Sequence, residues 1–324
     1  MSAAAPRWGM TIPLPGVTLR DHRSLVERLA EWGYTDLWTA EVAGLDALTP
    51  LAAAASWSID LRFGSAIASI FSRGPALLAM EAASLADLAP DRFVLGLGSS
   101  SPLLVEGWNA GRLHRPHARM RDTLDFLDRA LRGERIDEQF ESFSVRGFAL
   151  ERPPAVPPRL MVAGLRSKML GLAGARSAGA ILGLVTPQDI PAMARKVHDA
   201  GPGREIAMRI GVYPTSDIDL ARAHCRRILA TYLNVPAYAA LHEELGRGSE
   251  IARIAREWRR GDRGAAVEAV PPDWVDEFFA VGSPGRCRER IESFVEAGVT
   301  APILSIMSTP ADPGAALRAL SRTP

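Results

Sequence analysis

Short runs of apolar residues recur along the chain at regular intervals, separated by segments of mixed polarity. Nearly every position within a run is apolar, which is typical of a β-strand buried on both faces of a parallel sheet. Eight runs of 5 to 9 residues follow this pattern: Arg7–Ile12, Thr35–Ala40, Leu61–Ser69, Phe93–Gly98, Leu160–Gly164, Ala180–Val185, Ile206–Val212 and Pro302–Met307. The pattern therefore predicts eight buried strands that pair in parallel.

The segments between the runs have the periodicity of amphipathic helices. Met120, Leu124 and Leu127 share one helical face. Thr186-Pro187 and Ser283-Pro284 each place a capping residue before a first-turn proline, which indicates a helix start. Eight strands that are each followed by a helix predict an α/β fold of the (β/α)₈, or TIM-barrel, type.

Two stretches exceed the minimal repeat of strand and helix. Residues 134–158, after the fourth strand and helix, bring Phe140, Phe143 and Phe148 in rough alternation and then four prolines, which predicts a hairpin and a linker. Residues 232–279 predict several short polar helices between the seventh strand and the eighth helix. A doubly wound open sheet is the alternative architecture, but the regular count of eight favours a single barrel domain over residues 1–324.

The composition is that of an ordinary globular protein, with 47% hydrophobic and 23% charged residues. A formal net charge of +1 gives no reason to expect a nucleic-acid partner or an anionic membrane. Cys225 and Cys287 form neither a zinc spacing nor a disulfide framework, which suits a reducing compartment. No run approaches the roughly 20 apolar residues that span a bilayer, and no secretory signal is evident. We therefore expect a cytoplasmic protein.

The active site of a (β/α)₈ barrel lies at the C-terminal ends of its strands. No His-x-His pair follows the first run and no cluster of acids forms, which argues against a metal-dependent hydrolase and predicts no metal site. Lys196 lies within a helix and Lys168 begins one, which disfavours a Schiff-base aldolase. The residues at the strand ends are Thr11–Pro13, Thr39–Glu41, Ala68–Ile70, Gly98–Ser101, Gly164–Lys168, Val185–Thr186, Tyr213 and Ser305–Met307.

Two of these strand ends have the composition of ligand-binding loops. The serines of Gly98–Ser101 either bind a ligand or form a helix-capping turn, since the segment lacks the remaining signals of a dinucleotide loop. Gly164–Met169 is the better anion site, because Arg166 and Lys168 flank Ser167, the expected cap of a helix N-terminus with free N–H groups. A solvated helix start without a ligand is the alternative.

Other candidate side chains also have two interpretations. Glu41 either orients or protonates a ligand at the barrel mouth or pairs with an arginine of a neighbouring loop. Trp108 either stacks on a planar ligand or packs within the protein. The histidines are all expected at the surface: His22, His114, His117, His198, His224 and His242.

Four segments stand in an order and spacing that identify a family. They are Gly33–Glu41, Arg92–Gly98, Ser100–Asn109 and Val162–Leu170, and the match extends from about Trp8 to Met307. By these segments the chain resembles the bacterial-luciferase-like superfamily of flavin and deazaflavin oxidoreductases, and more narrowly its branch that uses the deazaflavin coenzyme F420. The resemblance implies one luciferase-like barrel domain with insertions, in agreement with the count of strands.

The resemblance also implies where a cofactor binds. The ring of F420, or alternatively of FMN, would lie at the strand ends, backed by a non-proline cis peptide bond that falls at Ser69–Ile70. The loop Gly164–Met169 would take the phosphate. The candidate cofactor-binding residues are Thr11, Ala68, Ser69, Ile70, Gly98, Ser99, Ser100, Ala163, Gly164, Arg166, Ser167, Lys168, Met169, Val185 and Thr186, and Glu41 is the candidate catalytic residue.

One position departs from the family pattern. Many members carry a histidine after the acid that ends the second strand, and here that position is Val42. Proton transfer is then left to Glu41 or to the substrate side, or the reaction is simple hydride delivery.

Three functions remain open at this point. The chain transfers a hydride between F420 and a small organic substrate, or it is an FMN-dependent monooxygenase, or it binds a flavin without turnover. Ile12, Leu14, Ile70 and Val42, expected at the mouth, suggest a substrate that is not highly charged. Because family members are often dimers, a homodimer is expected.

Overall fold

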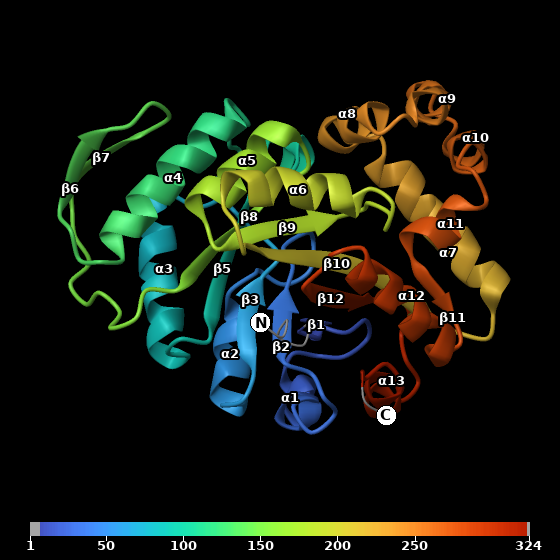
Figure 1. Ribbon diagram of the computed structural model, residues 1–324, viewed down its shortest axis with the longest axis horizontal. Helices are drawn as coiled ribbons and strands as arrows, with labels where there is room; N and C mark the ends of the chain where they lie inside the picture. The colour runs from blue at the N-terminus through green and yellow to red at the C-terminus, as the bar shows by residue number, and fades with distance from the viewer. Residues whose placement is uncertain (1–6, 323–324) are drawn as a thin grey trace.

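The computed structural model describes residues 7–322. Eight parallel strands form a closed barrel that helices surround (Figure 1). In order round the ring they are β1 (Gly9–Ile12), β2 (Asp36–Thr39), β3 (Arg62–Ser65), β5 (Phe93–Gly98), β8 (Arg159–Ala163), β9 (Gly179–Gly183), β10 (Glu205–Pro214) and β12 (Ala301–Ile306). Strand β10 pairs with both β9 and β12, which closes the ring. The predicted (β/α)₈ barrel is confirmed, and the open sheet is wrong.

Helices pack their apolar faces against the outside of the barrel. They are α1 (Arg23–Leu29), α2 (Thr49–Trp57), α3 (Pro75–Leu88), α4 (Pro116–Ala130), α5 (Ser167–Arg176), α6 (Ile190–Ala200), α7 (Ile218–Tyr232), α12 (Pro284–Glu296) and α13 (Pro313–Ala319). The layer between helices and strands holds the main core, in which Phe93, Leu127 and Phe294 are almost completely buried. Burial of each such side chain contributes about 1.5–3 kcal/mol, so this layer holds the barrel together.

The first predicted insertion is confirmed as a hairpin of β6 (Ile136–Gln139) and β7 (Ser144–Phe148). It lies outside the barrel beside α4 (Figure 1). Phe140, Phe143 and Phe148 of this segment place their rings 5.5–6.4 Å from the ring of Phe126 in α4. The aromatic alternation seen in the sequence therefore anchors the hairpin to α4.

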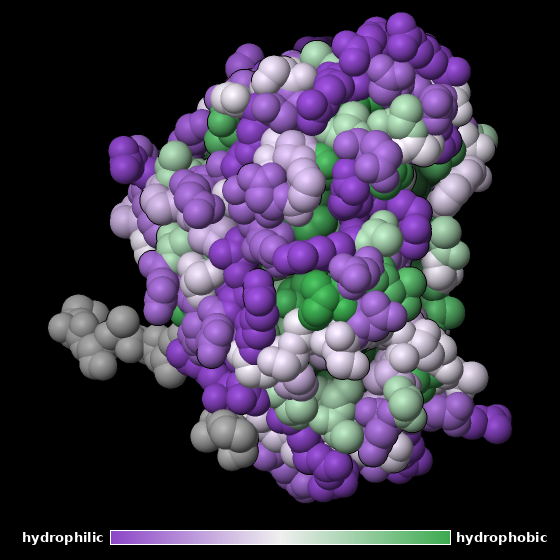
Figure 2. All heavy atoms as spheres, turned by 90° about the vertical axis from the view of Figure 1, so that its right-hand side faces the viewer, coloured by the Kyte–Doolittle hydropathy of each residue, from purple (hydrophilic) through white to green (hydrophobic). Residues whose placement is uncertain are grey.

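The second predicted insertion is confirmed as a group of short helices at one side of the barrel (Figure 1). Its outer face is mostly hydrophilic (Figure 2), but Trp274 and Phe278 belong to a second core beneath it. The elements are α8 (Pro236–Glu244), α9 (Gly248–Arg259), α10 (Arg263–Glu268), α11 (Trp274–Phe278) and the strand β11 (Ala280–Gly282), which pairs with β10.

Side chains fill the N-terminal end of the barrel interior. Arg62 reaches Asp36 at 2.6 Å and Glu205 at 2.7 Å. Trp38 is fully buried among the interior residues, and a Cβ on Gly64 would come within 2.3 Å of its ring. The glycine therefore makes room for the indole. With this end closed, space for a ligand lies toward the C-terminal ends of the strands.

The predicted third strand is broken. The run Leu61–Ser69 divides into β3 and a two-residue strand, β4 (Ala68–Ser69), and the non-proline cis peptide bond is Ala66–Ile67. The prediction of this bond at Ser69–Ile70 is wrong. A second cis bond, Ile12–Pro13, follows β1.

The pairing with β5 explains where the irregularity falls. Between the pair Gly64–Val94 and the pair Ala68–Leu97, one strand advances four residues while β5 advances three. The extra residue is taken up in a local bend, as in a β-bulge. The Ser69–Ile70 bond follows this bend, after regular pairing with β5 has resumed. The apolar run in the sequence is continuous, so it gave no sign that the strand is broken.

His22 is buried, so its prediction as a surface residue is wrong. Its Nε2 accepts a hydrogen bond from the Leu14 backbone N–H at 2.8 Å, and its Nδ1 contacts the Thr18 carbonyl oxygen at 2.7 Å. Burial lowers the pKa of His22. The neutral ring holds the loop after β1, a tertiary role that helical periodicity does not reveal.

Candidate active site

The C-terminal strand ends bring most of the predicted cofactor residues to one end of the barrel, because parallel strands all finish at the same edge. Ala68, Ile70 and Val185 are fully buried there. The predicted residues that the strands bring to this end are Thr11, Ala68, Ser69, Gly98 and Ala163, and the segments 164–169 and 185–186 follow β8 and β9.

The serine loop after β5 leads into a helical turn. Ser101 Oγ accepts a long hydrogen bond of 3.4 Å from the Leu104 N–H at the start of a π-helical turn, Leu103–Trp108. Ser99 and Ser100 remain half-buried at the mouth, and Ser100 has a left-handed φ of 62°. Ser101 therefore takes part in the turn that begins this helix, whereas a ligand role for Ser99 and Ser100 stays a prediction.

Thr11 has an unsatisfied polar atom at the mouth. Its hydroxyl is buried, and no hydrogen-bond partner for it occurs among residues 7–322. A buried polar atom without a partner costs about 1–3 kcal/mol. A ligand with a polar edge would satisfy it, so the site fits a cofactor ring that carries carbonyl and N–H groups.

The predicted phosphate loop begins α5 at the mouth. The helix starts at Ser167, so Arg166 and not Ser167 occupies the capping position, and it makes no side-chain cap. Lys168 is exposed. Arg166 pairs with Glu244 of α8 at 2.6 Å. Lys168 and the helix N-terminus therefore present positive potential to solvent, whereas the charge of Arg166 is already paired with Glu244.

Thr186 belongs to a buried polar network in the loop after β9. Its backbone N–H and its hydroxyl each donate to Asp189 Oδ2 at 2.8 Å, and Arg247 reaches both residues at 3.1–3.2 Å. Helix α6 begins at Ile190, so the predicted helix start at Thr186-Pro187 is wrong. The Thr186 side chain serves this network in the structure.

His242 joins the same network, and its prediction as a surface residue is wrong. It is fully buried in α8, its Nε2 lies 3.0 Å from the Leu184 carbonyl oxygen, and Arg247 lies 3.3 Å from its Nδ1. Burial, with a further effect of Arg247, lowers the pKa of His242 to about 4. A neutral histidine therefore fastens the helical insertion to the loop after β9.

Glu41 meets an arginine of a neighbouring loop. Arg73 Nη1 lies 2.5 Å from Glu41 Oε2, and the same guanidinium lies 3.2 Å from Glu81. Arg73 and Glu41 are mostly buried, with side-chain exposures of 10% and 21%. Burial raises the pKa of Glu81, against the effect of Arg73. The geometry favours the ion-pair interpretation of Glu41 over a free proton donor.

The apolar lining predicted for the mouth differs in the structure. Ile12, Leu14 and Ile70 are at most 2% exposed and belong to the main core, whereas Val42 is exposed. These three side chains therefore belong to the core and not to an exposed lining of the mouth. A substrate that is not highly charged stays a prediction.

Trp108 lies at the end of the π-helical turn and is 53% exposed. An indole that exposed is not a core residue, so the packing interpretation is wrong. Turns of this kind are frequent at functional sites. The structure leaves the Trp108 ring free to stack on a planar group.

Sequence reasoning missed two polar residues near the mouth, Arg209 and Tyr238. Arg209 occupies an interior position of β10, and Tyr238 projects from α8 with its hydroxyl 4.0 Å from the Cβ position of Gly183. The available signal for Arg209 was its position as a lone arginine within an apolar strand. Tyr238 lies in an insertion whose packing the sequence does not reveal.

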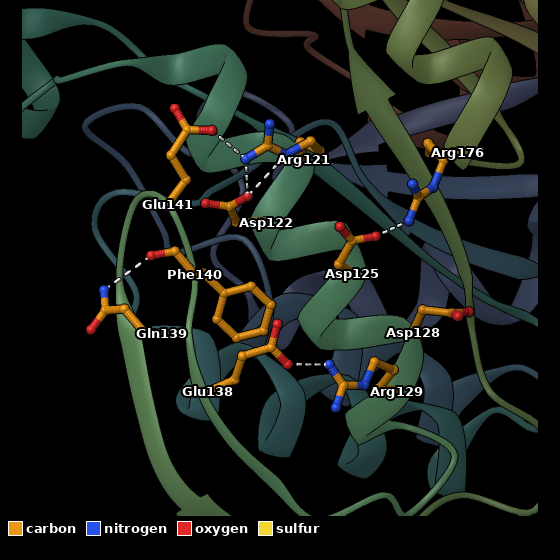
Figure 3. Close-up of a pocket in the computed structure, with 10 residues that line it drawn as sticks. All are labelled: Arg121, Asp122, Asp125, Asp128, Arg129, Glu138, Gln139, Phe140, Glu141 and Arg176. Carbon is orange, nitrogen blue, oxygen red and sulfur yellow. Dashed lines mark hydrogen bonds and ion pairs between the residues drawn. The ribbon is translucent and has the colours of Figure 1, made fainter.

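Two surface grooves lie outside the mouth. One, of about 380 Å³, runs between α4, α5 and the hairpin (Figure 3). Its charges pair with one another, as in Arg129–Glu138 at 2.5 Å and Arg121–Glu141 at 2.6 Å. The other lies between α1 and α13. Both are therefore surface features apart from the strand ends.

Within the described part of the chain, no group of three or more histidine, cysteine or acidic residues has the arrangement of a metal site. Over the same residues, none of the helices is long and apolar enough to cross a membrane.

Known proteins share this architecture. The family model described as luciferase-like monooxygenase matches residues 3–301. A Mycobacterium tuberculosis protein whose name places it among coenzyme F420-dependent oxidoreductases is 27% identical over 92% of each chain.

Two solved structures superpose over at least 98% of both chains and, at these identities, show the shared fold alone. The coenzyme F420-dependent tetrahydromethanopterin reductase of Methanopyrus kandleri has a TM-score of 0.78 at 18% identity. A Pseudomonas putida Baeyer-Villiger monooxygenase component in complex with FMN has a TM-score of 0.67 at 17% identity. Taken with the family match over most of its length, these likenesses show that the chain is an enzyme that belongs to the luciferase-like monooxygenase family.

Proposed function

We propose that the enzyme transfers a hydride between coenzyme F420 and a small organic substrate at the barrel mouth. The observation that carries the proposal is the Thr11 hydroxyl at the end of β1, which has no hydrogen-bond partner among residues 7–322. On the opposite side of the same ring of strand ends, the loop before α5 presents Lys168. The relative that matches 92% of the chain supports F420 over FMN. When bound, F420 supplies a carrier that accepts or donates two electrons as hydride.

The chain itself would bind, orient and shield the reactants. Lys168 and the first N–H groups of α5 would hold the phosphate, and Thr11 would hydrogen-bond the ring edge. Trp108 would cover a planar group at the rim. Glu41, held by Arg73, would fix the loop after β2.

Anaerobic turnover tests this proposal. The enzyme is mixed with reduced F420 and a panel of small carbonyl compounds, and return of the oxidised deazaflavin absorbance is followed. Oxidation that depends on both enzyme and carbonyl compound is expected. Substrate-dependent oxygen uptake with reduced FMN, and none of this anaerobic oxidation, would establish the monooxygenase alternative. Absence of both reactions would leave a flavin-binding barrel and contradict the proposal.

We also propose that the chain acts as one barrel domain over residues 1–324 and forms a homodimer. Leu77, Met80 and Leu88 share one face of α3 and are 45–49% exposed. Apolar side chains gathered on one helix face favour association. Light scattering should give twice the chain mass, and the monomer mass for the Met80→Glu variant.

A further inference from the structure

Arg209 points into the barrel near its open end. In the parallel pairing it stands between Gly183 of β9 and Ile303 of β12. Ile303 packs with Trp38 in the interior cluster, and paired residues of neighbouring strands face the same side. The guanidinium reaches Ser305, two residues further along β12, so it extends toward the C-terminal ends of the strands.

The charge of Arg209 has no carboxylate partner among residues 7–322. Arg209 Nη2 donates a hydrogen bond to the Ser305 hydroxyl at 3.1 Å. Arg209 Nε is buried without a hydrogen-bond partner among the same residues. Arg62, at the closed end of the same interior, is instead paired with two carboxylates. Arg209 is half-buried and its Nε is shielded from solvent. A charge that loses hydration is compensated by a partner, and Arg209 lacks the carboxylate partners that Arg62 has.

Other hydrogen-bond donors surround Arg209. Met10 pairs with Leu304, so Thr11 and Ser305 are the next residues on the two neighbouring strands, and the Thr11 hydroxyl is also unsatisfied. Tyr238 stands over Gly183, beside Arg209. Burial raises the pKa of Tyr238 to about 12, with Arg209 acting in the opposite direction. The phenol therefore keeps its proton and can donate.

We propose that Arg209, Ser305 and Tyr238 form a subsite for a carboxylate group of the substrate. Nε and Nη2 of a guanidinium match the two oxygens of a planar carboxylate. A single positive charge balances a single negative one, whereas a phosphate dianion would leave a charge unanswered. This inference rests on the proposed function for its substrate, but it is tested without a cofactor.

The test measures binding of benzoate and benzamide to the cofactor-free protein by calorimetry. The two probes share a shape and differ in charge. Wild-type protein should bind benzoate at least about tenfold more tightly than benzamide, the size of a charge-assisted contact. The Arg209→Gln variant should reduce this ratio to within about threefold. Arg146→Gln, on the exposed hairpin, should keep the wild-type ratio.

Arg209→Lys keeps the charge and removes the planar fork, so it provides a second test if the glutamine variant does not fold. The preference of this variant for benzoate over benzamide should be at least about threefold smaller than that of the wild type. The proposal is wrong if wild-type protein does not bind benzoate or shows no preference, or if both folded variants keep the wild-type ratio. Neither result affects the F420 experiments, so the two proposals fail separately.

Discussion

Arg73 shows how a single side chain decides the role of another at the mouth. Its guanidinium lies against Glu41 and Glu81 and within 4.0 Å of Asp46, in a region where most of its surface is buried. A carboxylate held this way is oriented by its partner. The position after Glu41 is Val42, so no histidine beside it can take over proton transfer.

We expect Glu41→Gln to act on stability rather than on turnover. Loss of a largely buried partner of Arg73 should lower the free energy of unfolding by about 1–2 kcal/mol, since Glu81 still compensates part of the charge. Turnover should remain within a few-fold. Urea unfolding and single-turnover kinetics measure the two effects, with the exposed Glu27→Gln as control. A 10²–10⁴-fold loss of turnover at unchanged stability, roughly the range of general acid catalysis, would make Glu41 a proton donor.

His242 should make stability depend on pH. Its pKa in the folded protein is about 4, and near 6.5 in the unfolded chain, so the unfolded chain binds more protons between these values. The contribution of neutral His242 to the free energy of unfolding is complete above pH 6.5 and is lost as pH falls toward 4. At pH 5 the free energy of unfolding should be lower by about 2 kcal/mol.

The free energy of unfolding at pH 7.5 and at pH 5.0 measures this effect. His242→Gln should flatten the difference between the two values, and the exposed His198→Gln should leave it as in the wild type. An equal fall in all three proteins would contradict the assigned role of His242.

Arg166, the residue before helix α5, pairs with Glu244 of helix α8, so the predicted phosphate loop contacts an element 78 residues away in the chain. Apolar runs predicted the strands well because burial on both faces leaves a local signature, and amphipathic periodicity did the same for the helices. The break after β3, the Arg166–Glu244 pair and the contacts of Arg247 with Thr186 and Asp189 involve residues distant in sequence, so no local pattern predicts them.

Substitutions in this loop should therefore have unequal effects on F420 affinity. Lys168→Ala should weaken binding about tenfold and Arg166→Ala about threefold, because Glu244 already pairs with Arg166. Glu244→Gln should strengthen binding about threefold. Fluorescence titration measures each affinity, and Lys196→Ala, the other lysine, is the control. Equal losses for both loop variants, with no gain for Glu244→Gln, would place the phosphate elsewhere.

At the scale of the whole molecule, the filled N-terminal end of the barrel and the strand ends leave one end of the barrel as the candidate site. That the strand ends meet there was predictable from the sequence, because barrel topology brings them together whatever their neighbours. The states of Thr11, Arg209 and Tyr238 were not, since a missing partner is visible only once every neighbour is placed.

The central claim is that this mouth binds a deazaflavin. Parallel titrations of the protein with F420 and with FMN test it most directly. F420 should bind with Kd near the micromolar range, roughly −8 kcal/mol, and FMN at least about tenfold more weakly, a difference of about 1.4 kcal/mol. Tighter binding of FMN, or binding of neither, would contradict the account.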